Sequence, residues 1–336
     1  MTKQMSDDDA LLGIFFEKIL ENAEKSVMVT DEKGVIMFIN AEFRDFFDAS
    51  RGDTIGKEWI DLLVPHAKRK DISVIFDNIK AEEILSKFDT PVIAADDIIK
   101  FMSWTTLPLR KDGKKLYLFF GSEEKYPSAR NGIMEYSLTK NRLSEECREV
   151  VDILFTASMK SEPGTASHSS KVMLLSIALA KKLKLGKKKI ENIKVAALLH
   201  DLGKLAIDGK ILFKKGKLNE AEYDQIKNHP EWGAKIASFI YFLRDIVPIM
   251  ICHHENYDGT GYPKGKRGED IPIESRILSV ADIYEALTAD RPYREGFLKE
   301  EAVAIIKGER GRKLDPRVTD VFLEMLRNNE VGKGDL

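Results

Sequence analysis

Residues 196–204 read AALLHDLGK, an apolar run that ends in a histidine followed directly by an aspartate. The apolar residues recur with helical spacing from Lys188 onward, which predicts a helix that carries His200 and Asp201 in its last turn and is ended by Gly203. A single such pair could be no more than a cation and an acid at a helix terminus. The rest of the chain decides between that interpretation and a functional site.

Five of the six histidines lie in one quarter of the chain, namely His168, His200, His229, His253 and His254. Asp282 follows in the apolar stretch VADIYEAL. Each residue alone could be an ordinary core or surface residue. Together they would bury many polar groups without partners in helices rich in Leu, Val, Ile and Ala, which is costly. The pattern therefore predicts a metal site.

The types of ligand narrow the choice of metal and of chemistry. Imidazoles and carboxylates without a thiolate favour Fe, Mn, Ni or Zn over Ca or Mg. The set is too large for one ion, and on two octahedral ions it leaves positions open for water or substrate oxygens. Such a two-metal site is typical of enzymes that hydrolyse phosphate esters.

A Gly-rich, basic stretch, YDGTGYPKGKRGEDIP, occupies residues 257–272, and DRPYR follows at 290–294. Its cations could hold phosphates, and arginine offers two-pronged contacts. The alternative is a solvated loop. We favour that alternative for Lys264, Lys266 and Arg267, and less so for Arg291 and Arg294, which follow directly on a helix that carries a proposed ligand.

The first part of the chain has a different pattern. SVMVTDEKGVIMFIN, residues 26–40, has apolar residues on both sides of a turn sequence and predicts a β-hairpin. Expected helices at 11–20, 41–47 and 66–80 and strands at 98–109 and 115–121 make this part an α+β module. Helical patterns dominate the second part, at 171–183, 188–200, 220–243, 273–288 and 298–307, after a first helix that begins near Cys147. We therefore expect an all-α second domain.

Composition excludes several classes of protein. The only cysteines, Cys147 and Cys252, are too few for a disulfide framework or a Cys-rich zinc site, which suits the cytoplasm. The longest apolar runs have about seven residues, far short of a membrane span, and the acidic N-terminus does not resemble a signal peptide. With 53 basic and 55 acidic residues, nonspecific nucleic-acid binding is not expected.

The stretch VMVTDEKGVIMFINAEFRDFF, residues 27–47, resembles the opening of a PAS sensor domain, and the resemblance covers about residues 20–125. It implies a domain for dimerisation and small-ligand sensing. The module lacks cysteine, which excludes a flavin–cysteine adduct. His66 follows Pro65 at an expected helix start, where a side chain faces solvent, so neither haem nor flavin is expected.

Three motifs in order, HDLGK, HHENYDGTGYP and VADIYEALTADRPYR, are similar to the HD-GYP family of cyclic di-GMP phosphodiesterases, over about residues 145–328. The resemblance implies metal binding by the five clustered histidines, Asp201 and Asp282, with Asp201 bridging two ions, most often Fe, with Mn next and Ni or Zn as alternatives. It implies that Asp201 and Lys204 are catalytic, and that Lys204, Tyr262, Arg291 and Arg294 contact substrate. A metal-bridging hydroxide would open cyclic di-GMP, the bacterial second messenger, to pGpG, which a second cleavage would convert to GMP.

Departures from the family pattern carry their own predictions. Members with three metals have a glutamate where this chain has Gly164, with Glu162 out of register, so two ions are expected. Lys171 and Glu285 are mild changes from the family's usual arginine and aspartate. Lys215 replaces a common proline in the loop after HDLGK.

The expected architecture is a PAS-like antiparallel sheet with helices at 1–125, a linker helix at 126–145, and an all-helical HD-GYP domain at 146–330. We expect a homodimer through the PAS-like domain and the linker helix, and signalling proteins as possible partners. Two other functions stay open. One is a catalytically weak cyclic-dinucleotide receptor or interaction module, and the other is an HD phosphohydrolase acting on a different cyclic dinucleotide.

Overall fold

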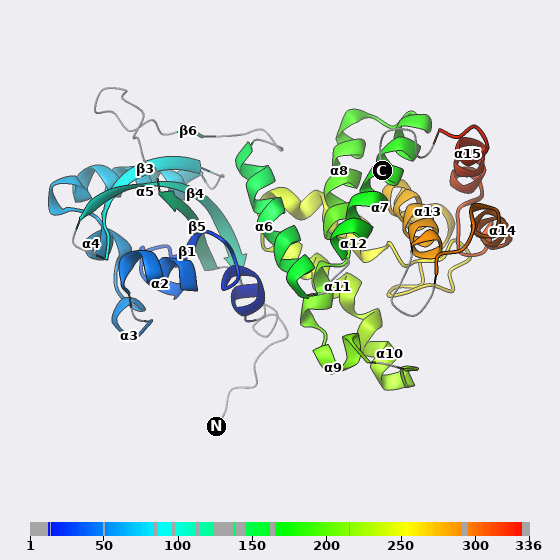
Figure 1. Ribbon diagram of the computed structural model, residues 1–336. Coiled ribbons are helices and arrows are strands. Elements are labelled where there is room, and N and C mark those ends of the chain that lie inside the picture. Colours follow the sequence, from blue (N-terminus) through cyan, green and yellow to red (C-terminus); the bar gives the residue numbers. More distant parts are fainter. Residues whose placement is uncertain are drawn as a thin grey trace. The chain divides into compact units, whose positions relative to one another are not determined.

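The structure, a computed structural model, describes residues 13, 15–49, 51–82, 86–95, 98–111, 114–123, 137–138, 145–161, 165–214, 216–289 and 295–330 (Figure 1). The chain divides into two compact units. The first comprises residues 1–153 with 239–242, and the second comprises residues 154–238 with 243–336. None of the described helices is both long and apolar enough to cross a membrane.

A six-stranded antiparallel sheet forms the centre of the first unit, in the order β2-β1-β5-β4-β3-β6. The strands are β1 (Ser26–Asp31), β2 (Ile36–Ile39), β3 (Ser86–Ile93), β4 (Ile99–Lys111), β5 (Lys114–Glu123) and β6 (Ser137–Leu138). The predicted hairpin is confirmed as β1 and β2. Gly34 has φ +82 in its turn, where Asp31 Oδ1 accepts hydrogen bonds from two backbone N–H groups.

Strand β3 was not predicted from the sequence, and its position explains why. It contains Pro91, which cannot donate a hydrogen bond and normally argues against a strand. One side of β3 pairs fully with β4, whereas on the other side β6 pairs only with Ser86 and Lys87. Pro91 therefore lies in a stretch of β3 where no described strand needs its missing N–H.

Helices α2 (Ala41–Phe47), α3 (Arg51–Thr54), α4 (Trp59–Leu63) and α5 (Arg69–Glu82) complete the unit, with a 3-10 turn at His66–Lys68 and a π-helix at Phe15–Leu20. Trp59, Phe76 and Phe119 are buried between helices and sheet, with ring centroids 5.4–6.0 Å apart. His66 is exposed, as expected for a first-turn residue.

Asn40 links the hairpin to α2. Its buried side-chain oxygen accepts hydrogen bonds from Val27 N at 2.8 Å and Phe43 N at 3.0 Å, and its amide donates to the carbonyls of Lys25 and Ala23. It is thus both the N-cap of α2 and a clamp on the start of β1. The terminal asparagine of the quoted hairpin motif has a structural function.

In the segment expected as a linker helix, 126–145, the described residues are Ser137–Leu138, which form β6, and Glu145, which begins α6 (Glu145–Ser161). The two residues of β6 are strand, not helix, and they pair with β3. The rest of this segment lies outside the described residues. The domain limits derived from the sequence stay a prediction.

The second unit is helical. The 3-10 helix η4 (Tyr241–Ile246) includes the point in the sequence, between residues 242 and 243, where the chain passes from the first unit to the second. The helices of the second unit are α7 (Thr165–Lys182), α8 (Lys187–Leu199), η3 (Leu202–Ala206), α9 (Gly209–Leu212), α10 (Glu220–Lys227), α11 (His229–Ser238), α12 (Val247–Ile251), η5 (Gly268–Asp270), α13 (Ile273–Thr288), α14 (Lys299–Glu309) and α15 (Pro316–Arg327). Helices α7, α8 and α13 pack against one another (Figure 1). The all-α prediction for this part of the chain is confirmed.

The single helix expected over 220–243 is wrong, because the structure divides it into α10, α11 and η4. Pro230 lies in the first turn of α11. A proline has no N–H to donate to the carbonyl four residues earlier, and its ring clashes with that carbonyl, so α10 cannot continue. The carbonyl that lacks this helical hydrogen bond is that of Ile226, and its oxygen lies 2.7 Å from Nδ1 of His229 instead.

Candidate metal centre

Three of the clustered histidines lie within two residues of the end of a helix, and their orientation depends on that position. His200 follows α8, and its Nδ1 lies 2.8 Å from the carbonyl oxygen of Ala197. The Nδ1 of His229 lies 2.7 Å from the Ile226 oxygen, and the Nδ1 of His253 lies 2.6 Å from the oxygen of Met250.

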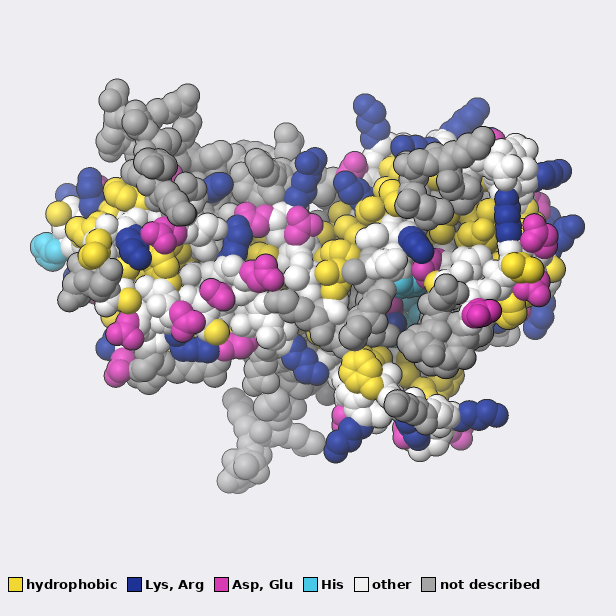
Figure 2. Space-filling view, in the orientation of Figure 1, with side chains coloured by type: hydrophobic (Ala, Val, Ile, Leu, Met, Phe, Trp, Pro, Cys, Tyr) yellow, Lys and Arg dark blue, Asp and Glu magenta, His cyan; other side chains and the backbone are white. Residues whose placement is uncertain are grey.

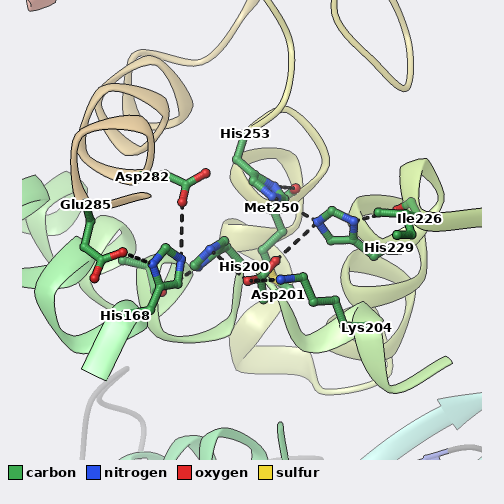
Figure 3. Close-up of polar contacts among 11 residues, drawn as sticks. His168, His200, Asp201, Lys204, Ile226, His229, Met250, His253, Asp282 and Glu285 are labelled. Atoms are coloured by element: carbon green, nitrogen blue, oxygen red, sulfur yellow. Dashed lines mark hydrogen bonds and ion pairs between the residues drawn. The ribbon is translucent and has the colours of Figure 1, made fainter. Parts of the chain in front are cut away.

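In each case the acceptor is the carbonyl three residues earlier, in the last turn of a helix, where carbonyls lack intrahelical donors. The Nδ1–H group therefore donates to the backbone, and Nε2 is left as an acceptor that faces the centre (Figure 3). This tautomer is the one that suits a metal ligand.

The ligand atoms form two groups. His168, His200 and Asp282 make one group, and His229, His253 and His254 make the other, with the ligand atoms of each group within 4.8 Å of one another. These residues come from α7, α13, the start of α11 and the positions just after α8 and α12. Each group is of a size and type that can hold a transition-metal ion.

Asp201 lies between the two groups. Its Oδ2 is 3.4 Å from His200 Nε2, and its Oδ1 is 3.4 Å from His229 Nε2. One carboxylate oxygen thus faces each group (Figure 3). Lys204 Nζ lies 2.8 Å from Oδ2, on η3 one turn after Asp201.

The arrangement of lone pairs tests whether a metal fits. His229 Nε2 and His253 Nε2 lie 3.3 Å apart. Because both rings donate Nδ1–H to carbonyls, both Nε2 atoms present lone pairs, which repel at this distance unless a cation or a proton lies between them. Burial lowers the pKa of both histidines, and that of His253 falls well below its usual value. A proton is therefore disfavoured, and these residues fit a metal ion.

His168 is held differently from the others. Its Nε2 lies 3.2 Å from Asp282 Oδ1, and its Nδ1 contacts the Glu285 carboxylate. Burial opposes protonation of His168, yet hydrogen bonds to the two acids raise its pKa to about 10. The same contact and the neighbouring imidazoles outweigh burial at Asp282 and hold the pKa of that carboxyl below its ordinary value.

The remaining charges favour a carboxylate bridge. Burial works to raise the pKa of Asp201, but the Lys204 ammonium and the His200 and His229 rings hold this pKa well below its usual value. Burial also lowers the pKa of His254, to about 4, which favours the neutral form of this histidine. At neutral pH the centre therefore combines an ionised Asp201 with a neutral His254, the protonation states that metal ligation requires.

Gly203 does not end α8, contrary to the prediction from the sequence. Helix α8 ends at Leu199, and Gly203 lies inside η3 without a positive φ. A Cβ atom at Gly203 would lie 1.9 Å from the carbonyl oxygen of His229 and 2.5 Å from Gly233 N. The glycine instead lets η3 cross α11 closely, which brings Asp201 to His229.

The Gly-rich loop is anchored next to the second group. Glu255 is 2% exposed, and its carboxylate accepts hydrogen bonds from the backbone N–H groups of Lys264 at 2.7 Å and Lys266 at 3.1 Å. Two residues before the first anchored position, Tyr262 N donates to His254 O at 3.2 Å, and the centroids of the two rings lie 5.0 Å apart. The loop thereby holds Tyr262 beside the metal ligands.

The centre is reached from solvent. Figure 2 shows histidine side chains at the floor of a hollow on this face of the helical unit. The side chain of Lys204 is 24% exposed, and those of His168 and Asp282 are 16% and 15% exposed. Solvent therefore reaches the side of the centre on which these residues lie.

The structure brings together every predicted metal ligand, with Lys204 and Tyr262 beside them. Arg291, Arg294, Gly164 and Lys215 lie outside the described residues, so their predicted contributions stay predictions. The sequence analysis missed the anchor Glu255 and the contact that Glu285 makes with His168. Two signals in the sequence were available: Glu255 directly follows the two adjacent histidines, and Glu285 lies three residues after Asp282 on the same predicted helix.

Comparisons with known proteins assign both parts of the chain. A family model described as HD domain matches residues 155–318, and one described as PAS fold matches residues 14–117. The cyclic di-GMP phosphodiesterase response regulator RpfG of Xanthomonas campestris is 38% identical over 185 residues, 54% of this chain and 49% of that protein.

Two further relatives are similar at this level. A cyclic di-GMP phosphodiesterase of Pseudomonas aeruginosa is 37% identical over 173 residues, which are 51% of this chain and 42% of that protein. A 3'3'-cGAMP-specific phosphodiesterase of Vibrio cholerae is 35% identical over 184 residues, 54% of this chain and 35% of that protein. The matches thus span half or less of the relatives' length. The chain combines a PAS fold with an HD domain, and the candidate metal centre lies within the HD domain.

Proposed function

We propose that this protein is a phosphodiesterase that hydrolyses cyclic di-GMP at a two-metal centre. The observation that carries the proposal is the pair of ligand groups, each within 4.8 Å, with the two oxygens of Asp201 directed one to each group. Similarity to relatives named cyclic di-GMP phosphodiesterases supports the choice of substrate.

The ligands and their number point to two ions. His168, His200 and Asp282 would hold one, His229, His253 and His254 the other, and Asp201 both. All of Fe, Mn, Ni and Zn accept imidazole and carboxylate ligands. Among them we propose iron, with manganese next and nickel or zinc as alternatives. When bound, such ions supply a nucleophilic oxygen at neutral pH and neutralise charge that develops on the phosphate.

The protein's own residues bind and orient the substrate. Lys204 stands 2.8 Å from Asp201. From this position the ammonium of Lys204 would contact a nonbridging oxygen of the scissile phosphate and stabilise its developing charge. Tyr262 lies beside His254 and would contact the substrate there. Arg291 and Arg294, just after α13, contribute two-pronged phosphate contacts.

The reaction opens the cyclic dinucleotide to linear pGpG, and a second hydrolysis yields GMP. A different cyclic dinucleotide is the second candidate substrate, because one of the relatives is named for specificity toward 3'3'-cGAMP.

Anaerobic metal analysis combined with product identification tests the proposal. Purified protein loaded with Fe or Mn under reducing conditions should cleave cyclic di-GMP, and Asp201→Asn should abolish both metal retention and cleavage. Equal mixtures of cyclic di-GMP and 3'3'-cGAMP rank the two substrates. Tight binding without turnover at any metal loading would indicate a receptor, and the absence of both binding and cleavage would refute the proposal.

For regulation, we propose that the PAS fold and the helix region before the HD domain form a homodimer that controls catalysis, in the cytoplasm and with signalling proteins as further partners. Helix α6 leads along the chain from the residues that match the PAS fold into those that match the HD domain, which supports this helix as part of the signalling path, and its apolar residues Cys147, Val150 and Leu154 are buried within the single chain. Light scattering tests the assembly, and a monomeric mass for the full chain at micromolar concentration would contradict it.

A further inference from the structure

Glu285 is a buried acid that no step of the proposed reaction uses. It is 4% exposed, and its carboxylate contacts Nδ1 of His168. A buried carboxylate is costly unless it is paired. Among the site histidines whose Nδ1 partner the structure describes, His168 is bound to a carboxylate, whereas His200, His229 and His253 donate to backbone carbonyls.

Helix α13 supplies both acids that hold this ring. Asp282 and Glu285 are three residues apart and therefore share one face of the helix. Asp282 faces Nε2 of His168 and Glu285 faces Nδ1, so each ring nitrogen contacts a carboxylate (Figure 3). With Glu285 as the partner of Nδ1, Nε2 is the ring nitrogen that faces Asp282, which is the other predicted ligand of the same ion.

The contact also makes the two halves of the centre unequal. The half formed by His168, His200 and Asp282 contains a carboxylate ligand and a second carboxylate behind its histidine. The half formed by the other ligand group contains imidazoles alone, apart from the shared Asp201. A carboxylate that accepts from a ligating histidine increases the basicity of that ligand, and added negative charge attracts a cation.

We propose that Glu285 is a positioning residue for His168 and that it makes the His168–His200–Asp282 half of the centre bind its metal ion first and more tightly. The inference rests on the proposed two-metal site. It adds an order of loading, in which the imidazole half fills second and loses its ion more readily.

Two substitutions separate charge from geometry. Glu285→Gln keeps the length of the side chain and an oxygen acceptor but removes the charge, and Glu285→Asp keeps the charge with a shorter reach. Glu274→Gln is the matched control, since Glu274 is also a buried acid of α13, 8% exposed, but it pairs with Lys189 at 3.2 Å, outside the ligand groups.

The experiment titrates the metal-free full-length protein with Co²⁺, followed by visible absorption, and with Mn²⁺, followed by calorimetry. The wild type should take up two ions in two separate steps. In Glu285→Gln the affinity of the first step should fall about 10- to 100-fold, with an altered Co²⁺ spectrum, and the second step should change little. Glu285→Asp should recover part of the affinity, and Glu274→Gln should match the wild type.

Two equal steps in the wild type, or an unchanged first step and spectrum in Glu285→Gln, would overturn the inference. Thermal unfolding of each metal-free variant identifies a folding defect, and if Glu285→Gln does not fold, the comparison of Glu285→Asp with the wild type decides. Stepwise metal uptake without cleavage of cyclic di-GMP would refute the proposed function alone. A wild type that takes up no metal would refute both.

Discussion

Gly203→Ala should loosen the metal centre without touching a ligand. The α-hydrogen of Gly203 that the new Cβ replaces points at the start of α11, where the added atom would lie 1.9 Å from the His229 carbonyl oxygen and 2.5 Å from Gly233 N. Both contacts are to backbone, which cannot rotate away as a side chain can. The alanine therefore has to push η3 and α11 apart.

The size of the effect follows from these distances. A Cβ atom needs about 3 Å from an oxygen, so the two segments must separate by roughly 1 Å. Overpacking of this kind costs about 1–3 kcal/mol, and the Tm of a domain of this size should fall by roughly 2–12 °C. Asp201 on η3 and His229 on α11 would move apart from their present 3.4 Å. A displacement of about 1 Å at a catalytic centre lowers the rate about 100-fold.

The assay compares thermal unfolding, bound metal per chain and cleavage of cyclic di-GMP for the variant and the wild type. Gly308→Ala is the control, because Gly308 lies in α14 with nothing within 4 Å of an added Cβ. Alanine should stabilise that helix by about 0.5–1 kcal/mol. If Gly203→Ala unfolds with the wild-type Tm and retains two ions, close packing at Gly203 does not set the geometry of the centre.

Three further predictions concern other parts of the molecule. Metal-free protein should lose a few kcal/mol of stability as the pH falls from about 6.5 to 4, because burial lowers the pKa of His254 to about 4 and the unfolded chain binds more protons in that window. Stability should also fall as the pH rises from about 6.5 toward 10, because the pKa of His168 is raised to about 10 and the folded chain binds more protons in that window. Urea unfolding across this range should show a maximum near neutral pH, and a flat profile would contradict these assignments. Glu255→Gln should raise KM for cyclic di-GMP roughly tenfold with little change in kcat, because a charged acceptor of two loop N–H groups is lost; a fall in kcat alone would argue against its function as a loop anchor. Asn40→Ala should destabilise the PAS fold by about 2–4 kcal/mol, since its buried side chain makes four hydrogen bonds, and a loss below about 0.5 kcal/mol in denaturant unfolding would show that they contribute little.

The sequence predicted much of the fold where local patterns were strong. The hairpin at β1 and β2 and the helix α13 follow from apolar spacing and turn residues, which act over a few positions. Prediction failed where distant partners decide the structure. Pro91 is accepted in β3 because no described strand pairs with that stretch on its second side. The division at Pro230 is a local effect of the proline, which the helix prediction over 220–243 missed because the apolar pattern continues on both sides of it.

The site shows the same division. Clustering of histidines and spacing of motifs were enough to name the candidate ligands, because metal chemistry restricts which residue types occur together. The division into two groups, and the position of Asp201 between them, could not be read from spacing, because these residues come from helices far apart in the chain.

By itself, the sequence determined many of the local elements and which side chains are chemically able to bind metal, since propensity and ligand type are properties of the residues. Only the tertiary structure decided how each side chain is oriented. Helix ends turn three histidines by offering unpaired carbonyls, Gly203 permits the close crossing that brings Asp201 to His229, and α13 places Glu285 behind His168. These contacts join residues distant in sequence, and their geometry exists only once the helices have packed.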